Sequence, residues 1–362
     1  MISDERVVRN PFKELGRVPT AEGIEESLFH RVYNVNVPQK AKDRRLVLAS
    51  TKIKLFEKLY SARIQQIKRV ESVVGRAHSF HVDLCDATVE GGYDSIMDDL
   101  KKLVGSSKII RALASRALQR MRRNPSLADS YKKEFLGRAG SVIKKLRPSF
   151  NRLNEAYIKL RELPDLNQEE FKVVVAGAPH VGKSSLVSRL TNRKIEIGSY
   201  PFTTKRINAG TISSGSGEVV VFDTPGLLDR PLHQRNPVER KAVSALRYLA
   251  NMVLFLVDPS ERAGYSLAFQ HSVLESVKEI IPETKILAVY THADRLGSFQ
   301  PGTVYVSNTT GYGIDELRQL ILSEAADWKK SRMRLPSKHL ESYDLETNRV
   351  FQGPSNPHSG HL

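Results

Sequence analysis

Apolar side chains recur at helical spacing through the first 165 residues. From Val47 to Val74 they stand mostly three and four residues apart, as on one face of an α-helix. The same spacing returns in Tyr93–Val104, Ile109–Arg123, Ser126–Leu146 and Phe150–Leu163. Gly105-Ser106-Ser107 predicts a break between two of these helices, and Pro148 suits a first helical turn. Helices bury such faces against one another, so we predict an all-α helical-bundle domain over residues 1–166.

The pattern changes at the joint Leu163–Gln168. Beyond it, short and nearly continuous apolar runs alternate with helical stretches. The runs are Phe171–Ala176, Val219–Phe222, Met252–Val257, Ile286–Tyr290 and Val304–Val306. This alternation predicts an α/β domain over residues 167–330, with a mostly parallel sheet covered on both faces. Residues 331–362 are polar and contain several prolines, which predicts a flexible tail.

The positive charge lies mostly in the first part of the chain. Of a net charge of +16, residues 1–165 carry 33 Lys and Arg against 20 Asp and Glu, and the remainder carries 23 against 20. A basic segment joined to a nearly neutral one predicts a polyanion-binding module. A merely solvated helical surface is the alternative.

Cys85 is the only cysteine, which excludes a disulfide framework and fits a cytoplasmic protein. The first ten residues lack the apolar region of a signal peptide. No apolar run reaches the length of a membrane span. We therefore expect no membrane partner, and we expect a monomer.

A phosphate-binding motif follows the first apolar run. Its residues, together with the serine after them, are Gly177, Ala178, Pro179, His180, Val181, Gly182, Lys183, Ser184 and Ser185. They match G-x-x-x-x-G-K-[ST] between a strand and a helix, where backbone N–H groups and the helix dipole bind phosphate. Lys183 is predicted to reach the β- and γ-phosphates and Ser184 to ligate Mg²⁺. A glycine turn before a helix is the alternative.

Two further elements complete a predicted Mg²⁺ and γ-phosphate site. Asp223 ends the run Val219–Phe222 and begins D-x-x-G, so it can hold Mg²⁺ through water while the N–H of Gly226 meets the γ-phosphate. Thr204, preferred to Thr203, lies in the loop between the P-loop and Asp223. Its hydroxyl can reach Mg²⁺ only while the γ-phosphate is present, which would make the loop a switch. A plain surface loop is the alternative.

Base recognition is predicted at Thr291-His292-Ala293-Asp294, after the run Ile286–Tyr290. The carboxylate of Asp294 can accept both guanine donors, N1–H and N2–H₂, and adenine has no matching pair. His292 stands where guanine sites usually carry lysine, so weaker affinity is expected. The loop at Ser307 and Asn308 would complete the pocket with a backbone N–H that donates to the guanine carbonyl. The alternative for Asp294 is a helix cap. Together the elements predict a Ras-like P-loop NTPase that binds GTP or GDP with Mg²⁺.

Several stretches resemble the Nog1 branch of the translation-factor class of GTPases, near Obg. They are Tyr200–Lys205, Asp223–Leu232 with Arg235-Asn236, and Ala242–Leu249 through Val257–Glu261. The basic helical segment is similar to the N-terminal domain of that branch. Because the long C-terminal extension of eukaryotic members is missing, we expect a compact, archaeal-like form. The resemblance implies assembly of the large ribosomal subunit, with its precursor and rRNA as partners and the particle as activator.

Three departures from the usual GTPase pattern bear on mechanism. Many relatives carry asparagine at His180 to help hold K⁺, and histidine is a poor ligand for a hard alkali ion. Leu227 stands where Ras-like enzymes use a water-orienting glutamine, a substitution that the family shares, so we predict slow intrinsic hydrolysis. With His292, these residues leave two alternatives open: an RNA-binding structural assembly protein with a degenerate, fold-stabilising nucleotide site, and an ATP-using protein.

Overall fold

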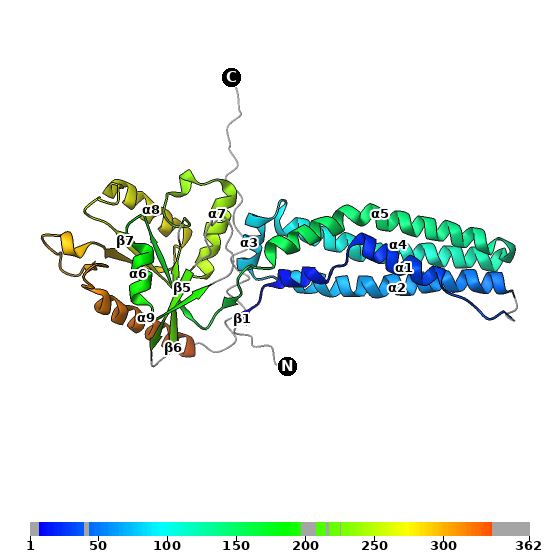
Figure 1. The fold of residues 1–362 in the computed structure, drawn as a ribbon, viewed down its shortest axis with the longest axis horizontal. Coiled ribbons are helices and arrows are strands. Elements are labelled where there is room, and N and C mark those ends of the chain that lie inside the picture. The colour runs from blue at the N-terminus through cyan, green and yellow to red at the C-terminus, as the bar shows by residue number, and fades with distance from the viewer. Residues whose placement is uncertain (1–6, 40–42, 197–207, 215–216, 225, 335–362) are drawn as a thin grey trace, which may run out of the picture.

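The computed structural model describes residues 7–39, 43–196, 208–214, 217–224 and 226–334. They form an α/β domain and a long helical bundle that lie end to end (Figure 1). The bundle packs α1 (Ala21–Tyr33), α2 (Arg44–Val74), α4 (Gly92–Arg123) and α5 (Ala128–Leu160) around their buried apolar faces. The predicted helical bundle and α/β domain are confirmed.

Short elements link the bundle helices to the rest of the chain. β1 (Val7–Val8) and the 3₁₀ helix η1 (Pro11–Arg17) precede α1, and η2 (Pro125–Leu127) turns the chain from α4 into α5. The short helix α3 (Ser79–Thr88) lies between α2 and α4, at the end of the bundle beside the α/β domain (Figure 1). It brings the helical region into contact with the α/β domain.

Two predictions about the bundle helices are wrong. Gly105-Ser106-Ser107 does not break a helix, because α4 runs without interruption from Gly92 to Arg123. There Ser106 is buried, and its Oγ lies 2.6 Å from the hydroxyl of Tyr60 in α2. Pro148 does not open a helix, because it lies inside α5. In both places contacts between helices override the local sequence preference.

An ionic cluster holds α5 against α4 just after Pro148. Ser149 Oγ donates to Asp99 Oδ1 over 2.8 Å, and the guanidinium of Arg152 donates to both oxygens of Asp99 over 2.7 and 2.6 Å. The Asp99 side chain is only 2% exposed. Such a buried, fully bonded carboxylate fixes the two helices in register, and α5 can therefore continue past its proline.

A seven-stranded sheet forms the centre of the α/β domain, in the order β4-β5-β6-β3-β7-β8-β9. The strands are β3 (Phe171–Gly177), β4 (Arg193–Glu196), β5 (Asn208–Ser214), β6 (Gly217–Asp223), β7 (Met252–Val257), β8 (Lys285–Tyr290) and β9 (Val304–Tyr305). Strands β6, β3, β7, β8 and β9 are parallel, and β5 is antiparallel to both of its neighbours. All five predicted runs are strands, whereas β4 and β5 were not predicted.

Helices cover both faces of this sheet. In β3, Val173 and Val175 face α6 (Lys183–Leu190) and α9 (Ile314–Arg334), whereas Val174 and Ala176 face the opposite side. That side is covered by α7 (Pro237–Ser244), the 3₁₀ helix η4 (Ala245–Tyr248) and α8 (Leu267–Ile280). The apolar core on this side is continuous with that of the bundle. Helix α9 ends at Arg334, beyond the predicted boundary at residue 330.

The joint between the two domains is tied down by hydrogen bonds. Its strand β2 (Leu166–Asn167) pairs antiparallel with β1. Asn10 Nδ2 donates to the carbonyl oxygens of Leu160 and Leu163 over 2.7 and 3.2 Å. His81 of α3 is fully buried, and its Nε2 lies 3.0 Å from the oxygen of Pro164. The N-terminal segment and α3 therefore fix the place where the α/β domain begins.

Candidate nucleotide-binding site

The predicted site residues follow strands that end at one edge of the sheet. β3 ends at Gly177, which pairs with Leu256 of β7, and β6 ends at Asp223, which pairs with Val175 of β3. On the other side, β8 ends at Tyr290, which pairs with Tyr305 at the end of β9. The register of the parallel strands therefore brings the phosphate, metal and base motifs to one carboxyl edge, where α/β folds bind ligands.

The P-loop has the backbone that its glycines predict. Gly177 has φ 140°, and a Cβ there would lie 2.6 Å from the carbonyl oxygen of Leu256, so only glycine allows the loop to lie this close to β7. Gly182 has φ 95° and caps the N-terminus of α6. Ala178 and Val181 are buried, Pro179 is half-buried, and His180, Ser184 and Ser185 are exposed. His180 has φ 63° at the tip of the loop.

The Lys183 ammonium lies inside the arc of this loop. Its Nζ donates to the carbonyl oxygens of Gly177 and Ala178, both over 2.8 Å. Burial lowers the pKa of Lys183, and the carboxylates of Asp229 and Asp223 oppose that shift. The lysine is thus held beside the N-terminus of α6, where a cation and backbone N–H groups can bind phosphate together.

Asp223 fits a role in holding a cation. The residue is only 4% exposed, and its Oδ1 atom is buried without a hydrogen-bonding partner among the described residues. A buried carboxylate oxygen in this position requires a compensating charge or an ordered water. Ser184, in the first turn of α6, and Asp223 are the described residues that could hold Mg²⁺. Thr204 lies outside the described residues.

The loop after Asp223 is fastened to the P-loop and to the core. Thr224 Oγ1 donates to the oxygen of Val175 over 2.7 Å, and the N–H of Gly177 donates to the oxygen of Leu228 over 3.0 Å. Leu227 is 2% exposed and belongs to the apolar core. Its side chain is committed to packing, and it has no group that could orient water. Gly226, with φ 80°, is exposed.

A buried arginine, Arg235, forms hydrogen bonds with the same loop after Asp223. The guanidinium of Arg235 is 2% exposed and donates to the oxygen of Gly226 and to the Asp229 carboxylate, each over 3.4 Å. The chain then enters α7, whose N-cap Asn236 accepts from the N–H of Glu239 over 2.8 Å. The loop after Asp223 is therefore connected through Arg235 to α7, the helix that packs on α3.

The predicted base pocket is assembled around Asp294. Its Oδ1 accepts a hydrogen bond from Ser307 Oγ over 2.5 Å, and this bond is the main reason why the pKa of Asp294 lies below its usual value. The carboxyl group is thereby kept ionised, as acceptance of two guanine donors requires. Thr291 is buried, and its N–H and Oγ1 both donate to the oxygen of Val257, over 2.8 and 3.2 Å.

Asn308 joins the base pocket to the P-loop. Its Nδ2 donates to the oxygen of Gly182 over 3.2 Å, and its Oδ1 is buried without a partner among the described residues. Sequence reasoning gave Asn308 only a backbone role, whereas its side chain bridges the two halves of the site. The N–H of Ser307 donates to the oxygen of Tyr312 over 2.9 Å and is therefore already engaged.

Asp258 is a residue of this site that sequence reasoning missed. It is fully buried, and its Oδ1 lies 3.3 Å from Nδ1 of His292, which has φ 57°. Burial raises the pKa of Asp258, but bonds from Ser260 and Ala263 outweigh burial and leave that pKa below its usual value. Asp258 directly follows strand β7, and strand β6, on the other side of β3 in the sheet, ends at Asp223. A buried apolar run directly before it is the signal that the sequence offers, although Asp258 belongs to none of the nucleotide-binding motifs.

Comparison with known proteins gives the same two domains. Residues 172–292 match the family model described as 50S ribosome-binding GTPase, and residues 12–167 match the NOG1 N-terminal helical domain. An uncharacterized protein of Methanocaldococcus jannaschii is 33% identical over 77% of this chain and 80% of its own length. Nucleolar GTP-binding protein 1 of Drosophila melanogaster is 30% identical over 68% of this chain, and that of Saccharomyces cerevisiae is 26% identical over 67%.

The fold and the site define a P-loop GTPase, in which a guanine nucleotide is the expected ligand. The helical domain specifies the branch, and the chain belongs to the Nog1 family of GTPases. It spans 38% of the length of each of these two nucleolar relatives. No helix in the described part of the chain is long and apolar enough to cross a membrane.

Proposed function

We propose that this protein is a slow GTPase that acts as a nucleotide-dependent switch in assembly of the large ribosomal subunit, and that its basic helical domain binds rRNA. The observation that carries the proposal is the union in one chain of a complete P-loop site and a bundle that holds most of the positive charge. One matching family model is described as 50S ribosome-binding GTPase, and two relatives are named nucleolar GTP-binding protein 1, which supports the same assignment. We propose a cytoplasmic monomer with no membrane partner.

The site residues divide the work of binding GTP. Lys183 and the N–H groups at the start of α6 bind the phosphates, and Asp294 selects the base. Mg²⁺ would neutralise charge between the β- and γ-phosphates, and Ser184, Thr204 and a water on Asp223 would hold it. The N–H of Gly226 would bind the γ-phosphate.

Slow hydrolysis follows from the side chain after Gly226. Because Leu227 is buried in the core, it cannot position the attacking water. A partner must then supply or organise the missing group, and the ribosomal particle is the proposed activator. A switch of this kind requires different affinities of the GTP and GDP states for the particle, and it does not require fast chemistry.

Titration of the purified protein with GDP and with ADP tests the nucleotide assignment. Preference for GDP supports the switch, whereas absence of binding would favour a structural protein with a degenerate site, and preference for ADP would favour an ATP-using protein. Sedimentation with large-subunit precursors, with GDP and then with a non-hydrolysable GTP analogue, tests the partner. Equal association in both nucleotide states would contradict the switch.

A further inference from the structure

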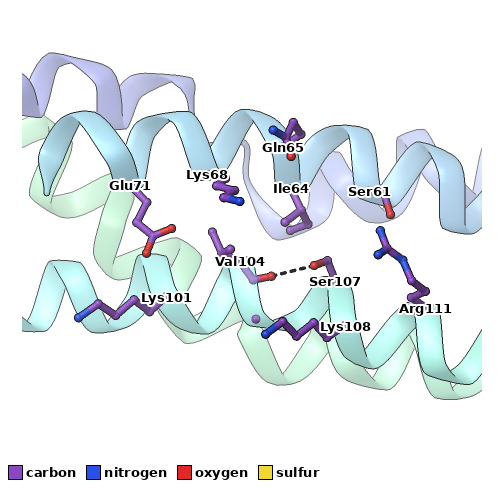
Figure 2. Close-up of a pocket in the computed structure, with 11 residues that line it drawn as sticks. Ser61, Ile64, Gln65, Lys68, Glu71, Lys101, Val104, Ser107, Lys108 and Arg111 are labelled. Atoms are coloured by element: carbon purple, nitrogen blue, oxygen red, sulfur yellow. Dashed lines mark hydrogen bonds between the residues drawn. The ribbon is translucent and has the colours of Figure 1, made fainter.

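A groove lies on the surface of the bundle between α2 and α4, far along the sequence from the nucleotide site. It encloses about 450 Å³. Lys68 lies on α2, and the opposite wall, on α4, carries Lys101, Lys108 and Arg111 (Figure 2). At 1.5 Å per residue, the cations of α4 extend over about 15 Å of the helix axis.

The positive charge of this groove is largely uncompensated. Lys68, Lys101 and Lys108 are exposed and form no ion pair with any residue that the structure describes. Arg111 pairs with Glu57 over 3.3 Å, but its side chain remains 70% exposed. Glu71 is the only acidic residue among those that line the groove. Like charges gathered on the two walls of one groove repel, and a bound polyanion would relieve that repulsion.

The α4 wall of the groove contains two residues with low helix propensity, Gly105 and Ser107. Gly105, in the middle of α4, has no packing reason to be glycine, because a Cβ there would meet nothing within 4 Å. Glycine in a helix interior is less favourable than alanine. Next to it, Ser107 satisfies its hydroxyl within the helix by donating to the oxygen of Val104 over 3.0 Å (Figure 2). A larger side chain at residue 105 would enter the groove, so the glycine leaves it open.

We propose that the α2–α4 groove binds the phosphate backbone of RNA. The lining favours RNA over an acidic protein segment, because apart from Ile64 and Val104 it consists of polar, charged or glycine residues. A helical protein ligand requires an apolar trough for its anchors, whereas hydroxyl groups and cations suit phosphate and sugar. This inference rests on the proposed rRNA binding and assigns it to one face of the bundle.

The test measures binding of the full chain to purified large-subunit rRNA between 50 and 200 mM salt. Lys68→Glu/Lys108→Glu reverses two groove charges, and Lys144→Glu/Lys145→Glu makes the same charge change at exposed positions on α5. The groove variant is expected to lose about 1.5 from the magnitude of the logarithmic salt slope, since each lost phosphate contact removes about 0.7 to 0.9. The α5 variant is expected to keep the slope of the parent.

Gly105→Leu obstructs the groove without changing its charge, and it is expected to weaken RNA binding about tenfold while α4 stays folded. Retained GDP binding and thermal unfolding verify that each variant is folded. Equal loss in both charge variants, with no effect of Gly105→Leu, would assign RNA affinity to overall charge and overturn the groove. Tighter binding of an acidic peptide than of RNA would also overturn it. Failure of the parent protein to bind rRNA would instead contradict the proposed function itself.

Discussion

The two domains use charge in different ways. In the α/β domain, a few charged groups converge on one edge of the sheet, and three of them have defined partners: Lys183 on the P-loop carbonyl oxygens, Asp294 on Ser307, and His292 near Asp258. In the bundle, cations spread along exposed helix faces, and several have no partner among the described residues. The arrangement in the α/β domain selects one ligand by the geometry of its contacts, whereas the arrangement in the bundle attracts a class of ligand by its positive electrostatic potential.

This contrast predicts that one substitution in the nucleotide site weakens ligand binding more than the substitution of any single lysine in the bundle. Lys183→Ala is expected to weaken GTP binding on the order of a thousandfold, since charge-assisted hydrogen bonds are worth about 1.5–3 kcal/mol each and the ammonium is proposed to bind two phosphates. Isothermal titration measures the loss. Lys108→Ala is the matched control, and its GTP affinity should equal that of the parent. A loss below tenfold in Lys183→Ala would contradict the assigned role.

At the joint between the domains, the buried imidazole of His81 is expected to make the free energy of unfolding depend on pH. Burial lowers the pKa of His81 from 6.5 to about 4, although its bond to the Pro164 oxygen opposes the shift. Between these pH values the unfolded chain binds a proton that the folded protein does not. The free energy of unfolding is therefore unaffected by His81 above pH 6.5 and falls as pH drops to about 4, by about 3 kcal/mol in total.

Urea unfolding at pH 7.5, 6 and 5 checks this sign and size. His81→Gln keeps a donor for the Pro164 oxygen but cannot titrate, so its stability should fall less over the same range. If parent and variant lost the same free energy between pH 7.5 and 5, the depressed pKa of His81 would not explain acid sensitivity.

The α/β domain was the easier region to predict because its signals are local. Each of the five predicted runs is an apolar strand, and the phosphate-binding, Asp223 and base motifs lie at strand ends, so parallel topology brings them to one edge. Strands β4 and β5 were not predicted. The sequence of β5, NAGTISS, has no apolar run, and only its antiparallel pairing with β6 identifies it as a strand. The side-chain role of Asn308 was not predicted either, because its hydrogen-bonding partner, the oxygen of Gly182, is distant in sequence.

Errors in the bundle came from contacts between helices. Gly105, Ser106 and Ser107 have the composition of a turn, and the bond between Ser106 and Tyr60 of α2 is invisible in a local window. Likewise, the Asp99 cluster holds α5 past Pro148. Turn composition inside a continuous helix often marks a functional surface, and here it coincides with the α2–α4 groove.

A smaller effect is expected from Asp258, which supports the base pocket without a direct role in the P-loop. Asp258→Asn removes the negative charge that lies near His292 and places an amide among donors. GDP affinity should fall about tenfold, the equivalent of one or two hydrogen bonds. His292→Ala should cause a similar loss, and the double variant should lose little more, because the two side chains act through one contact. Fully additive losses would show that Asp258 acts apart from His292.

The smallest effect concerns the ion pairs that connect the two domains. Lys241 of α7 pairs with Asp86 over 3.1 Å, and Arg247 of η4 pairs with Asp83 over 3.1 Å, yet the two cationic side chains are 56% and 47% exposed. Exposed pairs contribute only about 0.2–1 kcal/mol. A double-mutant cycle with Asp86→Asn and Lys241→Gln, followed by urea unfolding, should therefore give a coupling energy of about 0.5 kcal/mol that vanishes in high salt.

The apolar contact between α3 and α7–η4, with Phe80 packed near Tyr248, must then supply most of the stability of this interface. A coupling energy above about 2 kcal/mol would reverse that order. The ion pairs would then hold the domains together, and salt would loosen the contact between the bundle and α7. A small coupling energy leaves that contact apolar, so α7 and α3 would stay packed at any ionic strength used to measure RNA binding.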